Sequence, residues 1–396
     1  MIDETILYPV GDNPPKARLL YGADVRDGLK HVADNSIQTI CTSPPYWGLR
    51  DYGTATWVGG DSNCNHTSSK DNDNLKPHVS RPNGGHRGGS NNECRLCGAK
   101  RVDSQIGLED SVEEYVKSIV DVFHACKRVL KSDGTLWLNL GDTYAGGGGA
   151  SGHTAQTKNM GRTTNSYGAV ATGGRVPLGL KAKDLIGIPW RVALALQADG
   201  WYLRNEIIWN KPAPMPESVK DRFTRTHESV FLFAHPDSKG KYYFDQAAVR
   251  EPCTTSSLKD ISRRNLALGK KGKFDARPDL HTRGREEYYS NDGKRNKRTV
   301  WTIGTSPYAG AHFACWPTEL VKNMVLAGSA KGNTVLDPFS GSATTGQVAM
   351  QHGRNYIGTD LNEDYFKLAK GRLLGVKATR KKSIEPDTST LDIFGA

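Results

Sequence analysis

The chain has 396 residues and a formal net charge of +11, enough length for one large α/β domain with insertions. The positive charge favours a polyanionic partner, with nucleic acid as the default. The sequence holds no apolar run long enough to span a bilayer and no export signal, and its seven cysteines do not form an even disulfide framework. We therefore expect a cytoplasmic protein without a membrane partner.

The first predicted strand spans residues 18–22 and is followed by a short helix at about 25–33. Asp24 lies between them, in a Gly-x-Asp turn. Aspartate is a common helix N-cap, so Asp24 is expected to cap this helix whether or not it also contacts a ligand.

The second predicted strand, residues 37–41, is apolar and ends at a stretch that organises the rest of the chain. Pro44 and Pro45 stop the strand and cannot donate backbone hydrogen bonds. The Ser43 hydroxyl and the Pro44 carbonyl are left as acceptors at a strand end, where open α/β sheets bind ligands. Tyr46 and Trp47 follow at once. The stretch either accepts a planar ring with an amino group, or it is a proline-rich turn with its aromatic side chains packed in the core.

The polar segment from about residue 54 to residue 100 is too long for a structureless loop in a compact domain. Four potential metal ligands lie near its ends: Cys64, His66, Cys94 and Cys97. Cys94 and Cys97 form a Cys-x-x-Cys pair, which Gly98 follows directly. This set predicts a structural zinc ion, which would replace the missing core. The basic residues at 76–87 could then face DNA. The alternative is four unrelated loop residues.

The middle of the chain reads as alternating helices and strands around a glycine-rich stretch. A helix at 110–131 begins with a Ser111–Glu114 capping box and is expected to end at Gly134. Residues 146–174 form either a loop that closes over a ligand or a linker. The remaining elements are strands at 135–140, 205–209 and 229–233 and a helix at 185–198.

The last third of the chain predicts a nucleotide-type strand–turn–helix. A strand ends at Asp337, a turn with Gly341 follows, and a helix begins near Thr344. A further strand ends at Asp360. A carboxylate roughly 20 residues past such a turn can accept both hydroxyls of a ribose.

Two of these stretches resemble the motifs of one family, the amino-methylating DNA methyltransferases. The first resembles the catalytic motif [DNS]-P-P-[YFW], closest to its N4-cytosine form, in Ser43, Pro44, Pro45 and Tyr46. The second resembles the S-adenosylmethionine motif, in Asp337, Pro338, Phe339, Ser340, Gly341 and Ser342. The order, catalytic motif first, is that of the permuted β class. The resemblance implies a circularly permuted, Rossmann-like methyltransferase sheet, here with a zinc-knuckle insertion and a target recognition region.

The resemblance also implies roles for single residues. Asp24 would contact the adenine of S-adenosylmethionine, and Phe313 would pack against its methionine end. Ala343 stands where the family usually has a second glycine, so the backbone path there could differ. The Trp-x-Lys-Pro sequence at 209–212 and the proline-rich turn after it resemble the stretch before target recognition. Lys211 and Arg222 are expected to contact DNA phosphates, with surface solvation as the alternative.

The expected division of the chain follows from these motifs. Residues 1–53 and 101–249 would form the catalytic half of the methyltransferase domain, and residues 301–375 the cofactor-binding half. Residues 54–100 would be the zinc-binding insertion, residues 250–300 the target recognition region, and residues 376–396 a flexible tail. Dimers are common in the resembled class. Residues 390–394 resemble peptides that bind the bacterial sliding clamp.

The resemblance predicts methyl transfer from S-adenosylmethionine to the exocyclic amine of a flipped base in double-stranded DNA. Ser43 and the Pro44 carbonyl would accept the amine hydrogens, and Tyr46 would stack on the base. No cysteine nucleophile stands in a Pro-Cys context, which argues against C5-cytosine methylation. Cytosine N4 is expected, with adenine N6 as the alternative. A catalytically inactive DNA-binding module and an RNA methyltransferase are further alternatives.

Overall fold

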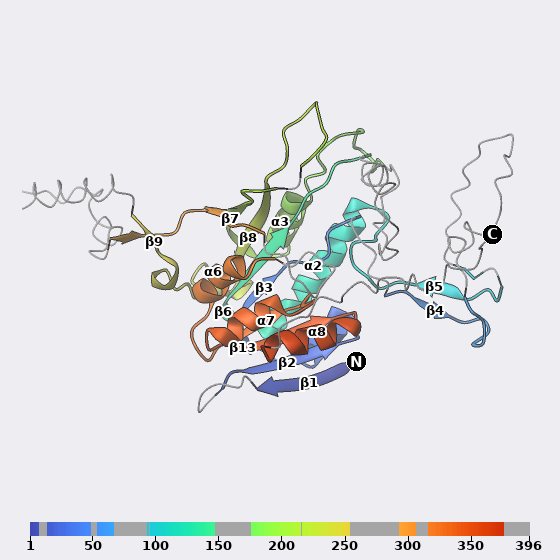
Figure 1. Ribbon diagram of the computed structural model, residues 1–396, viewed down its shortest axis with the longest axis horizontal. Helices are drawn as coiled ribbons and strands as arrows, with labels where there is room; N and C mark the ends of the chain where they lie inside the picture. The colour runs from blue at the N-terminus through green and yellow to red at the C-terminus, as the bar shows by residue number, and fades with distance from the viewer. Residues whose placement is uncertain are drawn as a thin grey trace, which may run out of the picture.

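A nine-stranded sheet forms the centre of the molecule, in the order β1-β2-β13-β12-β3-β6-β8-β7-β11 (Figure 1). The computed structural model describes residues 1–7, 14–48, 54–66, 93–94, 96–146, 176–214, 216–253, 293–305 and 316–375. The strands are β1 (Ile2–Leu7), β2 (Lys16–Tyr21), β3 (Ile37–Thr42), β6 (Leu130–Leu140), β7 (Tyr202–Asn210), β8 (His227–Ala234), β11 (Val300–Thr302), β12 (Thr334–Asp337) and β13 (Asn355–Asp360).

The five strands from β2 to β6 in the sheet order are parallel to one another, and β1 and β8 run against their neighbours. The carboxyl ends of β2, β13, β12, β3 and β6 therefore share one edge of the sheet. Ligands bind at this edge in open α/β sheets. The strand that precedes the catalytic motif and the strand that precedes the cofactor motif, β3 and β12, are direct neighbours.

Helices cover both faces of the sheet (Figure 1). One face packs against α1 (Val25–Lys30), α2 (Val112–Val129) and α3 (Ile188–Ala198), and the other packs against α6 (Thr318–Gly328), α7 (Thr344–Gln351) and α8 (Asp364–Leu373). Alternation along the strands supplies both cores: Leu136 and Leu138 face α2, and Trp137 between them faces α6. None of the described helices is long and apolar enough to cross a membrane.

The end of one helix and the presence of one strand differ from the sequence prediction. The Ser111–Glu114 capping box of α2 is present, but α2 ends at Val129 and β6 begins at Leu130. Gly134, expected to end the helix, therefore lies inside a strand. The edge strand β1 was not predicted, because three consecutive polar residues, Asp3, Glu4 and Thr5, interrupt its apolar positions.

Two small sheets lie beside the main one. β4 (Thr56–Val58) pairs with β5 (Lys100–Val102) at the ends of the expected zinc-binding insertion, and β9 (Glu251–Pro252) pairs with β10 (Lys294–Arg295) at the ends of the expected target recognition region. Most of both regions lies outside the described residues. The same holds for the glycine-rich stretch 147–174, for Phe313 and for the tail with the clamp-binding resemblance.

Candidate active site

The carboxyl-end edge of the sheet brings the two sequence motifs together. β3 leads into Ser43, and the neighbouring β12 ends in Asp337. The side chain of Thr42, the last residue of β3, donates a hydrogen bond of 2.6 Å to Asp337 Oδ1. A buried contact thus joins residues that are separated by almost 300 positions in the sequence.

Asp337 is buried and holds the turn that follows it. Its Oδ1 also accepts the Phe339 backbone N–H (3.1 Å), and its Oδ2 accepts the Thr345 hydroxyl (2.6 Å). Burial raises the pKa of this carboxyl to about 6, although these hydrogen bonds favour its charged form. Both oxygens are engaged inside the protein, so the geometry favours a role in shaping the cofactor turn. Direct contact with a cofactor stays a prediction.

The turn itself is fixed by two tyrosines under it. The hydroxyls of Tyr21 and Tyr356 lie 2.6 and 2.7 Å from Ser340 Oγ, and Tyr21 also donates to the Gly341 carbonyl (2.9 Å). Thr359 donates to the Pro338 carbonyl (2.7 Å). These contacts anchor the turn to β2 and β13. Ser340 and Ser342 are consequently buried.

Ala343 adopts a left-handed conformation, with φ 58° and ψ 43°, at the N-cap position of α7. Glycine adopts this conformation at no steric cost. An alanine at positive φ is strained by about 1 kcal/mol, and its complete burial in the core offsets part of this strain.

Asp360 presents its carboxylate at the same edge. Its Oδ2 accepts the Gly341 backbone N–H (2.7 Å) and its Oδ1 accepts the Asn362 backbone N–H (2.9 Å). Burial raises the pKa of Asp360 to about 6. Each carboxylate oxygen has a further lone pair, so Asp360 can accept two ribose hydroxyls without giving up these contacts.

Asp24 caps α1 as predicted, because its Oδ1 accepts the Arg26 backbone N–H (2.8 Å). The guanidinium of Arg26 also pairs with both carboxylate oxygens, at 2.7 Å. Contact between Asp24 and the adenine of a cofactor stays a prediction, and it would have to share a carboxylate that Arg26 occupies.

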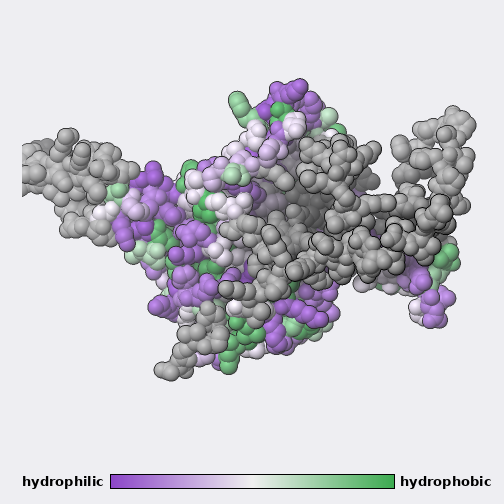
Figure 2. All heavy atoms as spheres, in the orientation of Figure 1, coloured by the Kyte–Doolittle hydropathy of each residue, from purple (hydrophilic) through white to green (hydrophobic). Residues whose placement is uncertain are grey.

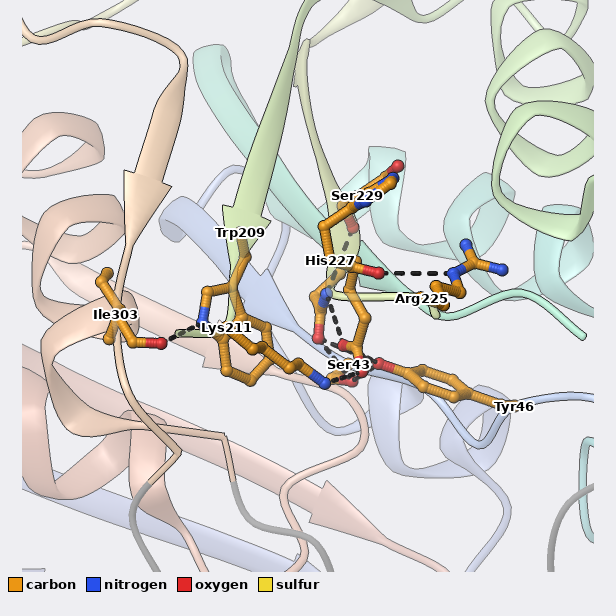
Figure 3. A network of polar contacts seen from close by, with 10 residues as sticks. Ser43, Tyr46, Trp209, Lys211, Arg225, His227, Ser229 and Ile303 are labelled. Atoms are coloured by element: carbon orange, nitrogen blue, oxygen red, sulfur yellow. Dashed lines mark hydrogen bonds and ion pairs between the residues drawn. The ribbon is translucent and has the colours of Figure 1, made fainter. Parts of the chain in front are cut away.

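Ser43 and Tyr46 belong to a polar network beside the end of β6 (Figure 3). Ser43 Oγ lies 3.3 Å from Asn139 Oδ1, and the Tyr46 hydroxyl lies 3.0 Å from the same atom. The Tyr46 hydroxyl also donates to Glu228 Oε2, at 2.8 Å. Burial and the charge of Glu228 raise the pKa of Tyr46 well above its ordinary value, so its hydroxyl stays a donor.

The ring of Tyr46 packs against the backbone of Gly141. A Cβ at position 141 would come within 2.4 Å of the Tyr46 ring, closer than carbon atoms approach without displacement. Gly141 is therefore needed for the position of this ring. The backbone behind the motif is held as well, because Tyr115 donates to the Pro45 carbonyl (2.9 Å).

Trp47 takes the second of the two alternatives left open for the motif's aromatic residues, because its side chain is buried in the core. Its indole N–H donates to the Glu109 carbonyl (3.0 Å). Of the two aromatic residues in the motif, Tyr46 is the one that the structure leaves partly exposed.

The two residues expected to contact DNA phosphates both have partners within the protein. Lys211 pairs with Glu228 and lies over the Trp209 ring, with 4.4 Å between Nζ and the ring centroid. Arg222 pairs with Glu217 (2.5 Å) and lies over the Tyr144 ring. Their phosphate contacts stay predictions. The described ends of the target recognition region lie around β9, where the surface is mostly hydrophilic (Figure 2).

The four expected zinc ligands converge. The ligand atoms of Cys64, His66, Cys94 and Cys97 all lie within 4.8 Å of one another. Cys64 Sγ and Cys94 Sγ are 3.8 Å apart, and Cys97 Sγ is 3.3 Å from His66 Nδ1. Two sulfurs on a tetrahedral ion with bonds of about 2.3 Å would be about 3.8 Å apart. The residues present therefore fit a zinc ion.

The surroundings of the cluster have features of a metal knuckle. The backbone N–H of Leu96 lowers the pKa of the Cys94 thiol to about 6. Gly98 has φ +71° and donates its N–H to the Cys94 carbonyl. The His66 ring stacks on Trp57 of β4, with 5.2 Å between the ring centroids. The cluster thus joins the two ends of the insertion.

Sequence reasoning missed three residues of the site: Asn139, Gly141 and Glu228. Asn139 and Gly141 lie where β6 ends, a position that the predicted strand 135–140 already placed at the correct sheet edge. Glu228 had no local signal, because it meets Tyr46 only through strand pairing across a separation of 182 positions.

A comparison with known proteins agrees with this geometry. The profile of the N6_N4_Mtase family, described as DNA methylase, matches residues 37–371. The chain belongs to this family. It is a DNA methyltransferase, and S-adenosylmethionine is its methyl donor. The match includes both motifs at the sheet edge.

Individual relatives of this DNA methyltransferase cover most of its length. The type II methyltransferase M.Cfr9I of Citrobacter freundii is 39% identical over 356 residues, which cover 90% of this chain and 87% of the relative. M.SmaI of Serratia marcescens is 40% identical over 352 residues, 89% of each chain. The solved structure of PvuII DNA methyltransferase, a cytosine-N4-specific enzyme, matches with a TM-score of 0.51 at 16% identity, over 94% of this chain and 92% of that one. At this identity the likeness shows the fold alone.

Proposed function

We propose that this DNA methyltransferase transfers a methyl group to the exocyclic N4 amine of a cytosine flipped out of the duplex. The observation that carries the proposal is the Thr42–Asp337 hydrogen bond, which sets Ser43 directly beside the cofactor turn. A base bound at Ser43 and a cofactor bound at Asp360 would meet at one sheet edge. Serine at the first motif position favours cytosine N4 over adenine N6, for which aspartate is commoner.

The reaction depends mainly on the alignment of the target amine with the methyl donor. An exocyclic amine is a poor nucleophile because its lone pair is delocalised into the ring. Ser43 Oγ and the Pro44 carbonyl would accept its hydrogens and direct the lone pair toward the methyl sulfonium. Bound S-adenosylmethionine would supply the methyl group and leave as S-adenosylhomocysteine, and the proton that the methylated amine loses would pass to solvent at the open sheet edge. Positioning of this kind can supply a large part of the rate enhancement.

The chain order supports membership of the permuted β class. β3 and β12 are parallel neighbours, yet the catalytic strand precedes the cofactor strand by nearly the length of the domain. We assign residues 301–375 to the cofactor-binding half on this basis. Homodimerisation and clamp binding by the tail stay predictions from the sequence.

The insertion at 54–100 is proposed to hold a structural zinc ion in Cys64, His66, Cys94 and Cys97. All four positions of a tetrahedral ion would be filled by protein ligands, as in structural sites. β4 and β5 contain three residues each, too few to form a core of their own. The ion would therefore supply much of the folding energy of this segment.

Metal analysis tests the zinc site. We expect about one zinc ion per chain in protein purified under reducing conditions without chelators, and loss of that zinc in Cys97→Ser. Cys253→Ser is the matched control, because Cys253 is a free thiol outside the cluster. Removing the metal should expose the insertion to proteases while the main sheet stays folded. Wild-type protein without zinc would contradict the assignment.

Product identity tests the proposed reaction. Duplex DNA of mixed sequence is incubated with the enzyme and S-adenosylmethionine, digested to nucleosides and analysed by mass spectrometry. N4-methylcytosine is the expected product.

A further inference from the structure

A chain of charged and polar groups lies behind Ser43 and reaches it from β7 and β8 (Figure 3). Lys211, just after β7, pairs with Glu228 Oε1 near the start of β8, and the two side chains are only 21% and 17% exposed. The Ser-Pro-Pro-Tyr motif itself has no carboxylate. Within the described part of the chain, Glu228 is a carboxylate that accepts a hydrogen bond from the motif, through the Tyr46 hydroxyl.

The contacts of Glu228 determine which way the Asn139 amide faces. A carboxylate can only accept, so the Asn139 amide turns its Nδ2 toward Glu228 Oε2, at 3.2 Å. The same Nδ2 donates to the Ser229 carbonyl, also at 3.2 Å. Both hydrogens of the Asn139 amide are then donated to groups of β8. Asn139 Oδ1 consequently faces the catalytic motif as an acceptor.

The orientation of Asn139 in turn sets the hydroxyl of Ser43. Tyr46 has one hydroxyl hydrogen and lies closer to Glu228 Oε2 (2.8 Å) than to Asn139 Oδ1 (3.0 Å), and a charged acceptor binds it more strongly. Asn139 Oδ1, at 3.3 Å, is therefore left to accept the Ser43 hydrogen, and the Tyr46 oxygen, at 3.4 Å, is a second acceptor within the same network. With its hydrogen so directed, Ser43 Oγ turns its lone pairs toward the open edge, where a target amine would donate.

We propose that Glu228, held by Lys211, is a positioning residue that keeps Ser43 as an acceptor for the target amine. This inference rests on the proposed function, because the amine is the group that Ser43 would accept. The proposal gives Lys211 a role in the catalytic site, through its ion pair with Glu228. Glu228 acts through Asn139 and Tyr46 and does not touch the reacting atoms.

The variant Glu228→Gln tests this role. The glutamine carbonyl would turn toward Lys211, so its NH2 group would face Asn139 and favour a flipped Asn139 amide. The flipped amide would donate to Ser43 and direct the Ser43 hydrogen at the target amine. We expect kcat to fall about 10- to 100-fold, with KM for DNA and for S-adenosylmethionine within about threefold of wild type.

A second variant separates positioning from plain structural support. In Glu228→Gln combined with Lys211→Met, the glutamine carbonyl is free to turn toward Asn139 and accept from it. We expect the double variant to recover at least about threefold in kcat over the single variant. The melting temperature is measured beside kcat, because an ion pair that only supports the fold would recover melting temperature in the double variant, once the unpaired Lys211 charge is removed, and would leave kcat per folded molecule unchanged in both variants. Equal or lower activity in the double variant would overturn the proposal.

A matched control is available on α2 and α3. Lys127 pairs with Asp199 at 2.7 Å, and both side chains are 19% exposed. Asp199→Asn removes a carboxylate of similar burial from a pair that makes no contact with the catalytic motif, and it should leave kcat unchanged. Unaltered kcat in Glu228→Gln would also overturn the inference. If the wild-type enzyme makes no N4-methylcytosine, the proposed function fails instead, so the two failures are distinguishable.

Discussion

Replacing Tyr46 with alanine should remove most turnover and leave S-adenosylmethionine binding nearly intact. Stacking of a base on an aromatic ring contributes about 1–3 kcal/mol, which corresponds to a loss of about 5- to 150-fold. The structure places the Tyr46 ring against Gly141 and fixes its hydroxyl at Glu228 and Asn139. The cofactor turn shares none of these contacts. Single-turnover methylation and calorimetric binding of S-adenosylmethionine measure the two effects separately.

Tyr46→Phe is the control for the ring. It keeps the stacking surface and removes the hydroxyl contacts with Glu228 and Asn139, so its loss should be smaller than that of Tyr46→Ala. Equal losses would assign the effect to the hydroxyl. Unchanged turnover in Tyr46→Ala would end the stacking role.

Affinity for S-adenosylmethionine should fall as the pH is lowered through about 6, because Asp360 then becomes protonated. Burial raises the pKa of this carboxyl to about 6, and a protonated carboxyl is a weaker acceptor for ribose hydroxyls. Hydrogen bonds to a charged group contribute about 1.5–3 kcal/mol. Asp360→Asn should therefore bind about 10- to 150-fold more weakly at pH 8.

The pH profile of Asp360→Asn is the control. Asp337 also has a pKa raised to about 6, so any slope that remains in Asp360→Asn reports Asp337. Acid unfolding driven by Asp337 and Asp360 cannot cause the same loss of affinity for S-adenosylmethionine. Their folded-state pKa values lie above the unfolded value of 3.8, so the native state binds more protons between pH 4 and 6 and acidification stabilises it. Wild-type affinity that does not change between pH 5 and 8 would contradict the role of Asp360.

The sheet edge could be predicted from sequence because strands with clear patterns end at distinctive residues. Ser43, Asp337 and Asp360 each follow an apolar run, and the carboxyl ends of parallel strands meet at one edge. The convergence of Cys64, His66, Cys94 and Cys97 could be predicted because residues that can bind a metal ion are few in kind and characteristically spaced.

Side-chain pairing across strands was not predictable in the same way. Lys211 was expected to contact phosphate because the stretch around it resembles the one before target recognition, and a lysine in a sequence gives no sign of a partner on a neighbouring strand. Its partner Glu228 lies 17 positions away on the neighbouring strand. The burial of Trp47 was left open for the same reason, since nothing in the motif shows which aromatic residue faces the core. Gly134 was read as a helix end because glycine often ends helices, whereas here the chain passes directly from α2 into β6.

The identity of the methylated nucleoside tests the central claim most directly. The enzyme is incubated with deuteromethyl-labelled S-adenosylmethionine and unmethylated duplex DNA of mixed sequence, and the digested nucleosides are identified by mass spectrometry. The account predicts label on N4-methylcytosine, and about 5- to 150-fold less of it with Tyr46→Ala over the same short incubation. Label on N6-methyladenine would contradict the assignment of Ser43 to cytosine, and label on RNA alone would contradict the DNA substrate.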